Sequence, residues 1–260
     1  MMRLILALTL LGSWACADNA SANVTSPVSI EIVGADGQVF HEIPVNARDG
    51  ASRSYLQAEK GARYQVRVRN NSGQRLGLVI AVDGRNIITG GKSDLARSEP
   101  MYVLSPYTTE AYAGWRANLD AINEFYFTDW SDSYAEAFGD RSARGVIAVA
   151  VYGEVPPPEP VSQLDSNDGR GADARAPAAR ESEKSAARRD EAPGTGYGER
   201  RVDHAVEVEF VASAGMPDRH FIKYEWRETL CRKHLLECGE QNRFWDEATL
   251  GFAPPPPGRR

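Results

Sequence analysis

The sequence predicts a mainly β protein: a β-sandwich with a disordered linker and a small C-terminal β/α segment docked on it. Short segments with apolar residues at alternate positions recur between residues 28 and 152. Turn signals rich in Gly, Asn and Asp separate these segments, and helical patterns are rare among them. We therefore expect a β-sandwich domain over residues 26–154.

The predicted strands follow one another closely along the chain. Residues 28–33 alternate, and after a turn at 34–37 they are followed by a predicted hairpin partner at 39–45. Ser133 and Glu136 have capping-box spacing, which predicts one short helix ending near Gly139. The continuous apolar runs at 76–82 and 145–152 are typical of central strands. Other strands are expected at 64–69, 85–88, 101–104, 108–113 and 122–128.

The composition changes after residue 154. Residues 155–193 are dominated by Ala, Arg, Glu, Asp and Ser and contain few large apolar side chains, which predicts a disordered linker. A C-terminal segment over residues 194–250 follows. It is too small for a core of its own, so we expect it to pack on the sandwich and add strands to its sheet. Its expected elements are strands at 204–211 and 220–226 and a helix at 227–236, with a mobile Pro-rich tail at 251–260.

The first 17 residues have the features of a secretory signal peptide. Arg3 supplies positive charge, residues 4–11 form an apolar run too short to span a bilayer, and Ala15-Cys16-Ala17 offers a cleavage site. Cys16 also allows a second outcome, in which the cysteine is lipidated and anchors the protein. We expect an exported protein, periplasmic or at the cell surface, that touches a membrane only if Cys16 is lipidated.

Export bears on the other two cysteines. Cys231 and Cys238 lie in an oxidising compartment if the protein is exported, which favours one disulfide between them. The net charge of −6 gives no case for a nucleic-acid partner. The four histidines are scattered and the cysteine spacing is a weak zinc pattern, so we expect neither a metal nor a cofactor.

Two glycine-rich strings resemble nucleotide-binding loops without meeting their requirements. Residues 90–93 end like a phosphate-binding loop, but Asn86 stands where that motif needs its first glycine. Residues 194–199, GTGYGE, resemble a dinucleotide fingerprint, but no predicted strand precedes them and no helix follows. We interpret this second string as a flexible turn, or as a glycine-lined surface where the backbone approaches a ligand or partner closely.

The most distinctive feature is a concentration of aromatic and Arg residues between residues 107 and 130. Most of these rings are expected in the core, because alternate residues of a strand face the interior. Rings at this density also stack on sugars or anchor a protein partner. The candidate binding residues are Trp115, Arg116, Tyr126 and Trp130, with Asp83, Arg85 and Asn86 in a polar loop and Tyr197 in the glycine string. The three residues of the polar loop are also explained by the preference of Asp and Asn for turns.

An acidic stretch keeps a second function open. Asp129, Asp132, Glu136 and Asp140 fit helix capping and the helix dipole, and their spacing does not match a calcium-binding loop. Acids of this region could also serve a hydrolase of envelope polymers. No nucleophile elbow is present, although a Ser/His/Asp site can assemble in space. The first hypothesis is therefore a non-enzymatic protein that binds an envelope protein or glycan, and the alternative is the hydrolase.

Five strings carry a resemblance: VDGRN at 82–86, Pro106-Tyr107 followed by Gly114-Trp115-Arg116, FYFT at 125–128, GVIAVAV at 145–151, and GTGYGE at 194–199. Together they resemble a family of exported proteobacterial proteins with no established activity, similar over most of the mature chain, including a closing segment like 224–236. The resemblance implies one linked unit in the bacterial envelope and no catalytic residue. It also implies His as often as Tyr at position 197, which argues against an acid–base role there.

Overall fold

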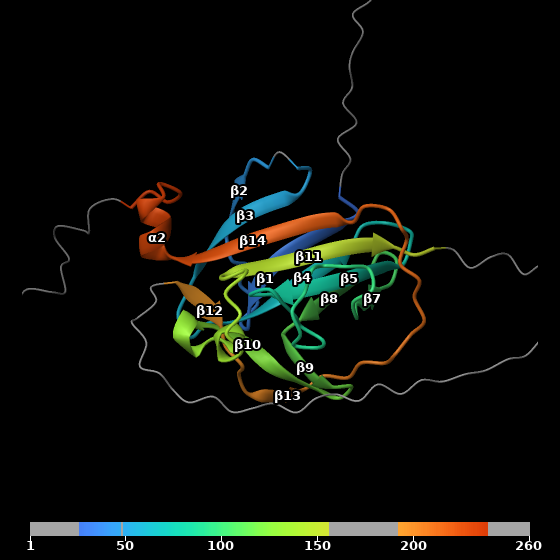
Figure 1. Ribbon diagram of the computed structural model, residues 1–260. Helices are drawn as coiled ribbons and strands as arrows, with labels where there is room; N and C mark the ends of the chain where they lie inside the picture. The colour runs from blue at the N-terminus through green and yellow to red at the C-terminus, as the bar shows by residue number, and fades with distance from the viewer. Residues whose placement is uncertain (1–25, 48, 156–191, 239–260) are drawn as a thin grey trace, which may run out of the picture.

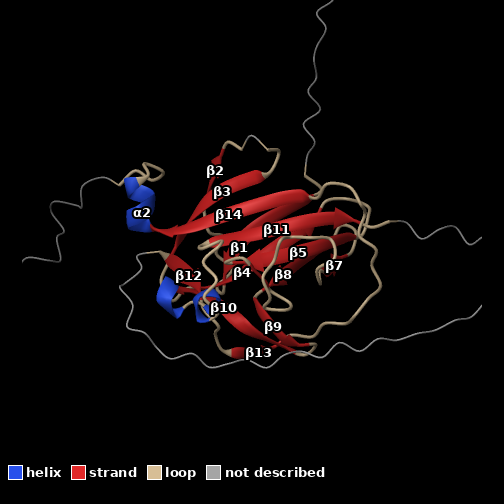
Figure 2. Cartoon of the chain, in the orientation of Figure 1, coloured by secondary structure: helices blue, strands red, loops and turns tan. Residues whose placement is uncertain are grey.

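The computed structural model describes residues 26–47, 49–155 and 192–238. Two seven-stranded sheets pack face to face, joined by long loops and a few short helices (Figures 1 and 2). The predicted mainly β sandwich with a C-terminal β/α segment is confirmed. The expected signal peptide with Cys16, nearly all of the expected linker, and the expected tail lie outside the described residues.

The first sheet is built on the strand order β1-β4-β10-β12. Its strands β1, β4 and β10 alternate buried and less buried side chains over much of their length, as expected for strands with one face on the core. Strand β8 pairs with β4, while β9 and β13 pair with β10. The strands are β1 (Val28–Gly34), β4 (Arg63–Asn70), β8 (Thr109–Tyr112), β9 (Gly114–Asn118), β10 (Ala121–Asp129), β12 (Pro193–Thr195) and β13 (Arg200–Val202).

The second sheet has the order β2-β3-β14-β11-β5-β6, with β7 beside β5. The C-terminal strand β14 lies inside this sheet, parallel to β3 and antiparallel to β11. The predicted central strand β5 is buried along its whole length. The strands are β2 (Glu42–Val45), β3 (Ser52–Ala58), β5 (Leu76–Val82), β6 (Arg85–Asn86), β7 (Tyr102–Leu104), β11 (Val146–Gly153) and β14 (Asp218–Trp226).

Three short helical turns complete the described fold: η1 (Trp130–Asp132), α1 (Tyr134–Ala137) and α2 (Arg227–Arg232). The predicted cap of α1 is present, since the Ser133 side chain accepts a hydrogen bond from the Glu136 N–H. Helix α2 is shorter than predicted because His234 adopts a left-handed conformation, and the Leu235 N–H then bonds the Leu230 carbonyl. The predicted disulfide between Cys231 and Cys238 is present, with the two Cα atoms 5.5 Å apart.

Aromatic side chains from both sheets fill the centre of the core. The Tyr64 ring stacks on Phe125 and Phe127, with centroids 5.3 and 4.3 Å away. Tyr224 of the second sheet meets Phe127 at 5.1 Å. The two Phe side chains and Tyr224 are fully buried, and burying one such side chain contributes roughly 2–3 kcal/mol. The C-terminal strand therefore supplies part of the central packing.

Two predicted strand pairings differ from the structure. The predicted hairpin of residues 28–33 and 39–45 exists only as a bridge between Val33 and Val39, because β1 pairs with β4 and β2 pairs with β3. The predicted strand at 204–211 is wrong: no strand is assigned there. Alternating residues need a neighbouring strand, and only the two ends of this segment reach one. Strands β3, β9, β12 and β13 form where no strand was predicted.

The glycine string GTGYGE forms part of the first sheet. Thr195 pairs with Phe127 of β10, and the Gly196 and Gly198 N–H groups bond the carbonyls of Tyr126 and Glu124. The glycines are needed because there is no room for side chains. A Cβ at Gly198 would lie 2.6 Å from the Glu124 carbonyl oxygen, and one at Gly196 would overlap the Tyr126 ring. The close backbone approach is thus to the protein's own strand β10.

We expect Gly196→Ala to lower the free energy of unfolding by about 1–3 kcal/mol, because the added methyl displaces the packed Tyr126 ring. Gly215→Ala is the matched control in the same C-terminal region, since the nearest atom to its added methyl is the Ser213 Oγ at 3.9 Å. Urea unfolding of both variants measures the difference. Equal stability of the two variants would contradict the close packing of the glycine string.

Candidate functional site

Asp83, one of the candidate binding residues, is fully buried. Asp83 and Gly84 form the two-residue turn between β5 and β6, with φ angles of 51° and 82°, as a type I′ turn requires. The Asp83 carboxylate accepts three hydrogen bonds, from the Gly145 N–H at 2.7 Å, the Thr195 N–H at 2.8 Å and the Tyr224 hydroxyl at 2.6 Å. This carboxylate therefore holds together three segments that are distant in the sequence.

Hydroxyl groups extend this contact from one sheet to the other. The Tyr224 hydroxyl lies 2.8 Å from the Thr195 Oγ1, which lies 2.7 Å from the Tyr64 hydroxyl. Burial raises the pKa of Asp83 to about 6, although its hydrogen bonds and the nearby Lys223 act in the opposite direction. Burial also raises the pKa of both tyrosines, which keeps their hydroxyls protonated. We call Asp83, Tyr224, Thr195 and Tyr64 the buried network.

Three of the strings singled out in the sequence meet at this network. Asp83 lies in VDGRN, Gly145 begins GVIAVAV, and Thr195 lies in GTGYGE. Each of these strings therefore supplies an atom to the same set of buried hydrogen bonds.

Two candidate tryptophans are also interior. Trp115 is 2 % exposed, and its indole N–H donates to the Gly196 carbonyl at 3.0 Å. Trp130 is 1 % exposed, and its indole N–H donates to the Glu136 carboxylate at 2.7 Å. Both polar ends are satisfied inside the protein. Both rings are interior and are not offered to a ligand.

Three further candidates are held by contacts within the chain. The Arg116 guanidinium donates to the Asp203 carbonyl at 2.7 Å and to the Tyr102 hydroxyl at 3.0 Å. Asn86 is buried and donates to the Pro100 carbonyl at 3.0 Å. Tyr126 is partly buried on β10, beneath the glycine string. These contacts explain the three residues as structural members of loops and of the first sheet.

The remaining candidates, Arg85 and Tyr197, lie at the two ends of a cluster of rings. The Arg85 side chain is only 11 % exposed and donates to the Gly90 carbonyl. Tyr134 stacks on Tyr197 with centroids 5.3 Å apart, and Phe138 meets Tyr134 edge-on at 5.0 Å. The Arg85 guanidinium lies 4.2 Å from the centroid of the Phe138 ring. Phe138 is 55 % exposed and Tyr197 is 49 % exposed. We call Arg85, Tyr134, Phe138 and Tyr197 the aromatic surface.

The aromatic surface rests on the interior. Tyr134 packs on Trp115 with centroids 4.4 Å apart, and the Asn123 amide donates to the Tyr197 hydroxyl at 2.6 Å. Sequence reasoning missed Tyr134 and Phe138. Their four-residue spacing on the predicted helix was the signal for a shared face, but the helix could not be placed beside the glycine string from the sequence.

Three of the four acids proposed for a hydrolase, Asp129, Glu136 and Asp140, are engaged in ion pairs. Asp129 contacts Lys60 at 2.5 Å, and Glu136 pairs with Arg141. The hydrogen bond from Arg141 holds the pKa of Glu136 below its ordinary value. Burial acts to raise the pKa of Asp140, but hydrogen bonds from Ser142 and the charge of Arg85 outweigh it, so that pKa is also lowered. A general acid needs the opposite shift.

Ser26, Asp218 and His220 form a Ser/His/Asp group in space. The Ser26 Oγ lies 2.5 Å from the Asp218 Oδ2 and 3.2 Å from the His220 Nε2, and the same Nε2 lies 3.0 Å from Asp218. A proton relay requires the serine and the carboxylate on different ring nitrogens. Here both lie on one nitrogen, so the group fastens the start of β1 to β14.

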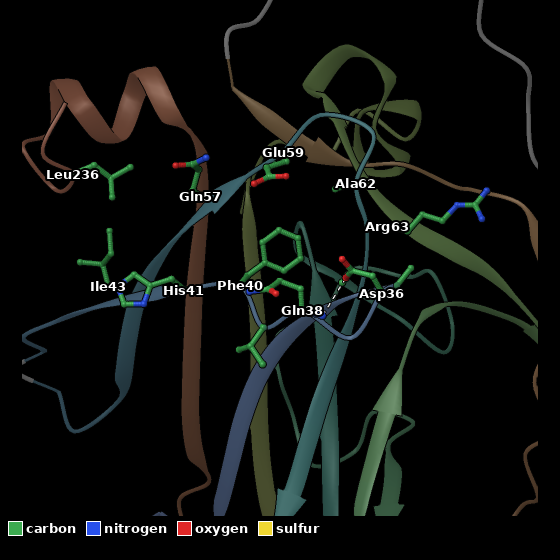
Figure 3. A pocket seen from close by; sticks show the side chains of 13 residues that line it. Asp36, Gln38, Phe40, His41, Ile43, Gln57, Glu59, Ala62, Arg63 and Leu236 are labelled. Atoms are coloured by element: carbon green, nitrogen blue, oxygen red, sulfur yellow. Dashed lines mark hydrogen bonds between the residues drawn. The ribbon is translucent and has the colours of Figure 1, made fainter. Parts of the chain in front are cut away.

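A pocket of about 510 Å³ lies between the turn after β1, the end of β3 and the residues after α2 (Figure 3). Phe40 lies at its centre and packs edge-on against Phe127 at 5.7 Å. Arg63, one of its charged residues, points away and pairs with Glu124 and Glu199 at 3.1 and 2.9 Å. The lining residues are Gly34, Ala35, Asp36, Gln38, Val39, Phe40, His41, Ile43, Gln57, Glu59, Ala62, Arg63 and Leu236, none of them a predicted binding residue.

Within the described ranges, no three His, Cys, Asp or Glu side chains are grouped so that they could hold a metal ion. No helix in the same ranges is long and apolar enough to cross a membrane. Comparisons of the chain with protein-family models, with curated proteins and with solved structures found no match.

The buried network makes a pH-dependent contribution to stability. Asp83 has a pKa of about 6 in the folded protein against an ordinary value of 3.8, so its protonation favours the folded state. That contribution is fully present below pH 3.8 and is lost as the pH rises through 6. Asp83→Asn removes this pH-dependent contribution. It also lowers the free energy of unfolding by an amount that does not change with pH, because the amide nitrogen cannot accept a hydrogen bond from the Thr195 N–H.

We therefore compare the free energies of unfolding of the wild type and of Asp83→Asn. The advantage of the wild type should shrink by about 2 kcal/mol as the pH rises from about 4.5 to 7. Urea unfolding at several pH values measures it. Curves that stay parallel over this interval would show that Asp83 does not titrate in the folded protein as its burial requires.

Proposed function

We propose that this protein is an exported, non-enzymatic β-sandwich module of the bacterial envelope that binds a glycan through the aromatic surface. The observation that carries the proposal is the pair of exposed rings, Phe138 and Tyr197, joined through Tyr134 and flanked by Arg85. Contiguous exposed apolar groups of this kind are typical of interaction sites on folded proteins.

The aromatic surface is organised before a ligand arrives. Tyr197 follows Thr195 of the buried network by two residues, and its hydroxyl is fixed by Asn123. Tyr134 is stacked on buried Trp115. Side chains already held in place lose little conformational entropy on binding, so more of the contact energy contributes to affinity.

The chemistry of the surface suits a sugar. A pyranose ring has an apolar face of C–H groups, which packs on an aromatic ring, and hydroxyls at its edge, which need donors and acceptors. Tyr197 and Tyr134 supply both a ring and a hydroxyl, and Arg85 adds a cation beside Phe138. The hydrolase alternative is less well supported, because the pKa values of Glu136 and Asp140 are lowered.

Export is proposed from the sequence alone and has its own test. Mass analysis of the mature protein, purified from its host envelope, should show a chain beginning near Asp18 if it is freely soluble, or at a lipid-modified Cys16 if it is anchored. Cys16→Ala should change the mass and the location only in the second case. A mature protein that keeps residues 1–15 would contradict export.

Glycan binding is tested with the tetramer of N-acetylglucosamine and with isolated peptidoglycan. We expect Phe138→Ala and Tyr197→Ala each to weaken binding at least about tenfold, the size expected for losing one well-placed aromatic contact of about 1.4 kcal/mol. Tyr197→His should retain most of the affinity, since its ring can still stack. Calorimetric titration measures the tetramer, and co-sedimentation measures peptidoglycan.

The matched control is Tyr107→Ala, which removes another exposed tyrosine, 71 % exposed and outside the aromatic surface. It should leave binding unchanged, and every variant should keep a single cooperative unfolding transition well above the temperature of the binding assay. The proposal is wrong if the wild type binds neither probe, or if Tyr107→Ala weakens binding as much as Tyr197→Ala.

A further inference from the structure

Residues 203–212 belong to the loop that connects β13 of the first sheet to β14 of the second sheet. The loop is the orange trace between these strands in Figure 1. The sequence of this segment, DHAVEVEFVA, alternates like a strand. Its apolar side chains are nevertheless exposed: Val206 by 82 %, Val208 by 53 % and Val211 by 65 %. These valines form a strand-like apolar segment that the sandwich does not cover.

Both ends of this 203–212 segment are fastened in β-type hydrogen bonds. At the first end the Asp203 and Ala205 N–H groups bond the carbonyls of Asp120 and Leu119 at 2.9 and 2.7 Å. At the second end Ala212 forms a bridge with Glu154, and the Val155 N–H bonds the Val211 carbonyl at 2.8 Å. The segment is therefore held at two points and not loosely attached.

The middle of the segment has free backbone groups. Within the described part of the chain, no backbone hydrogen bond involves residues 206–210; the Glu209 carbonyl accepts only from the Arg75 side chain, at 3.1 Å. Phe210 is the anchor, because its ring lies against Gly77 and 5.8 Å from the Arg75 guanidinium. A β-prone segment with unpaired N–H and C=O groups is the type of edge to which another strand adds.

The charges of the segment decide which strand it accepts. Glu207 and Glu209 lie between the valines, so a partner strand meets carboxylates at alternate positions. A second copy paired antiparallel with Glu207 at its centre would place two carboxylates directly opposite each other, and one centred on Val208 would oppose Glu207 and Glu209. Like charges directly opposite are unfavourable, whereas opposite charges stabilise the pair.

We propose that residues 205–211 bind an extended, basic segment of a partner protein by β-strand addition. Backbone hydrogen bonds from residues 206–210 hold the partner strand, apolar side chains of the partner pack on Val206 and Val208, and its Lys or Arg side chains pair with Glu207 and Glu209. This interaction surface is separate from the aromatic surface and does not depend on glycan binding.

The test uses the full mature chain and three fluorescent peptides. The first has the sequence KVKVKVK, the second is its acidic counterpart EVEVEVE, and the third is the basic peptide with N-methyl groups on alternate backbone nitrogens. Fluorescence anisotropy should show that the basic peptide binds at least tenfold more tightly than the acidic one. N-methylation should remove most of this binding, because it keeps the charges but blocks one hydrogen-bonding edge.

Variants of the protein locate the site. Glu207→Lys combined with Glu209→Lys should reverse the preference, so that the acidic peptide binds more tightly. Val206→Thr combined with Val208→Thr should weaken binding of the basic peptide about tenfold. Val39→Thr, at another exposed valine (43 % exposed), should have no effect. Absence of binding to the basic peptide, equal binding of its N-methylated form, or an unchanged preference in the double-lysine variant would each overturn the proposal.

Discussion

The structure depends on a buried carboxylate with three donors. Asp83 is without solvent exposure and accepts hydrogen bonds from Gly145, Thr195 and Tyr224. A buried carboxylate is costly unless its oxygens are satisfied, so the three donor segments must be in place together. The Asp83 turn follows β5, Gly145 precedes β11, Thr195 lies in β12 and Tyr224 in β14. The C-terminal segment is thereby bound into the fold of the sandwich.

The same contact determines where the exposed rings lie. Thr195 fixes β12 against β10, and Gly196 accepts the indole N–H of Trp115 through its carbonyl. Tyr197 is the next residue, and its ring stacks on Tyr134, which packs against the Trp115 indole. The chain that leads to the proposed function therefore runs from one buried hydrogen-bond network, through a glycine-rich strand, to a surface of two exposed rings.

The local patterns in the sequence predicted much of the fold. The apolar run of β5, the Asp83-Gly84 turn, the Ser133 cap and the Cys231–Cys238 disulfide all form as predicted, because each depends on residues close together in the chain. Which strands pair with one another was harder to predict. The Val33–Val39 turn was recognised, but nothing local shows that β1 and β2 enter different sheets.

The site could be predicted only in part, for a related reason. Arg85 and Tyr197 were identified as candidates, but Asp83, Asn86, Trp115 and Trp130 proved to be buried. Polar and aromatic residues in a turn or strand look alike in sequence whether they face solvent or the core. Asp83 is the clearest example: its turn conformation was readable, while its burial depends on Thr195 and Tyr224, which are 112 and 141 residues away.

The role of the Asp83 carboxylate is tested most directly by native-state hydrogen exchange at the backbone amides of Thr195 and Gly145, followed by NMR. If the Asp83 carboxylate holds these segments in the core, both amides should exchange only through global unfolding, with the same free energy as the central amides of β5 and β11. Rapid exchange of Thr195, at the rate of an exposed loop, while β5 stays protected, would show that the glycine string is not part of the folded core and would contradict the account.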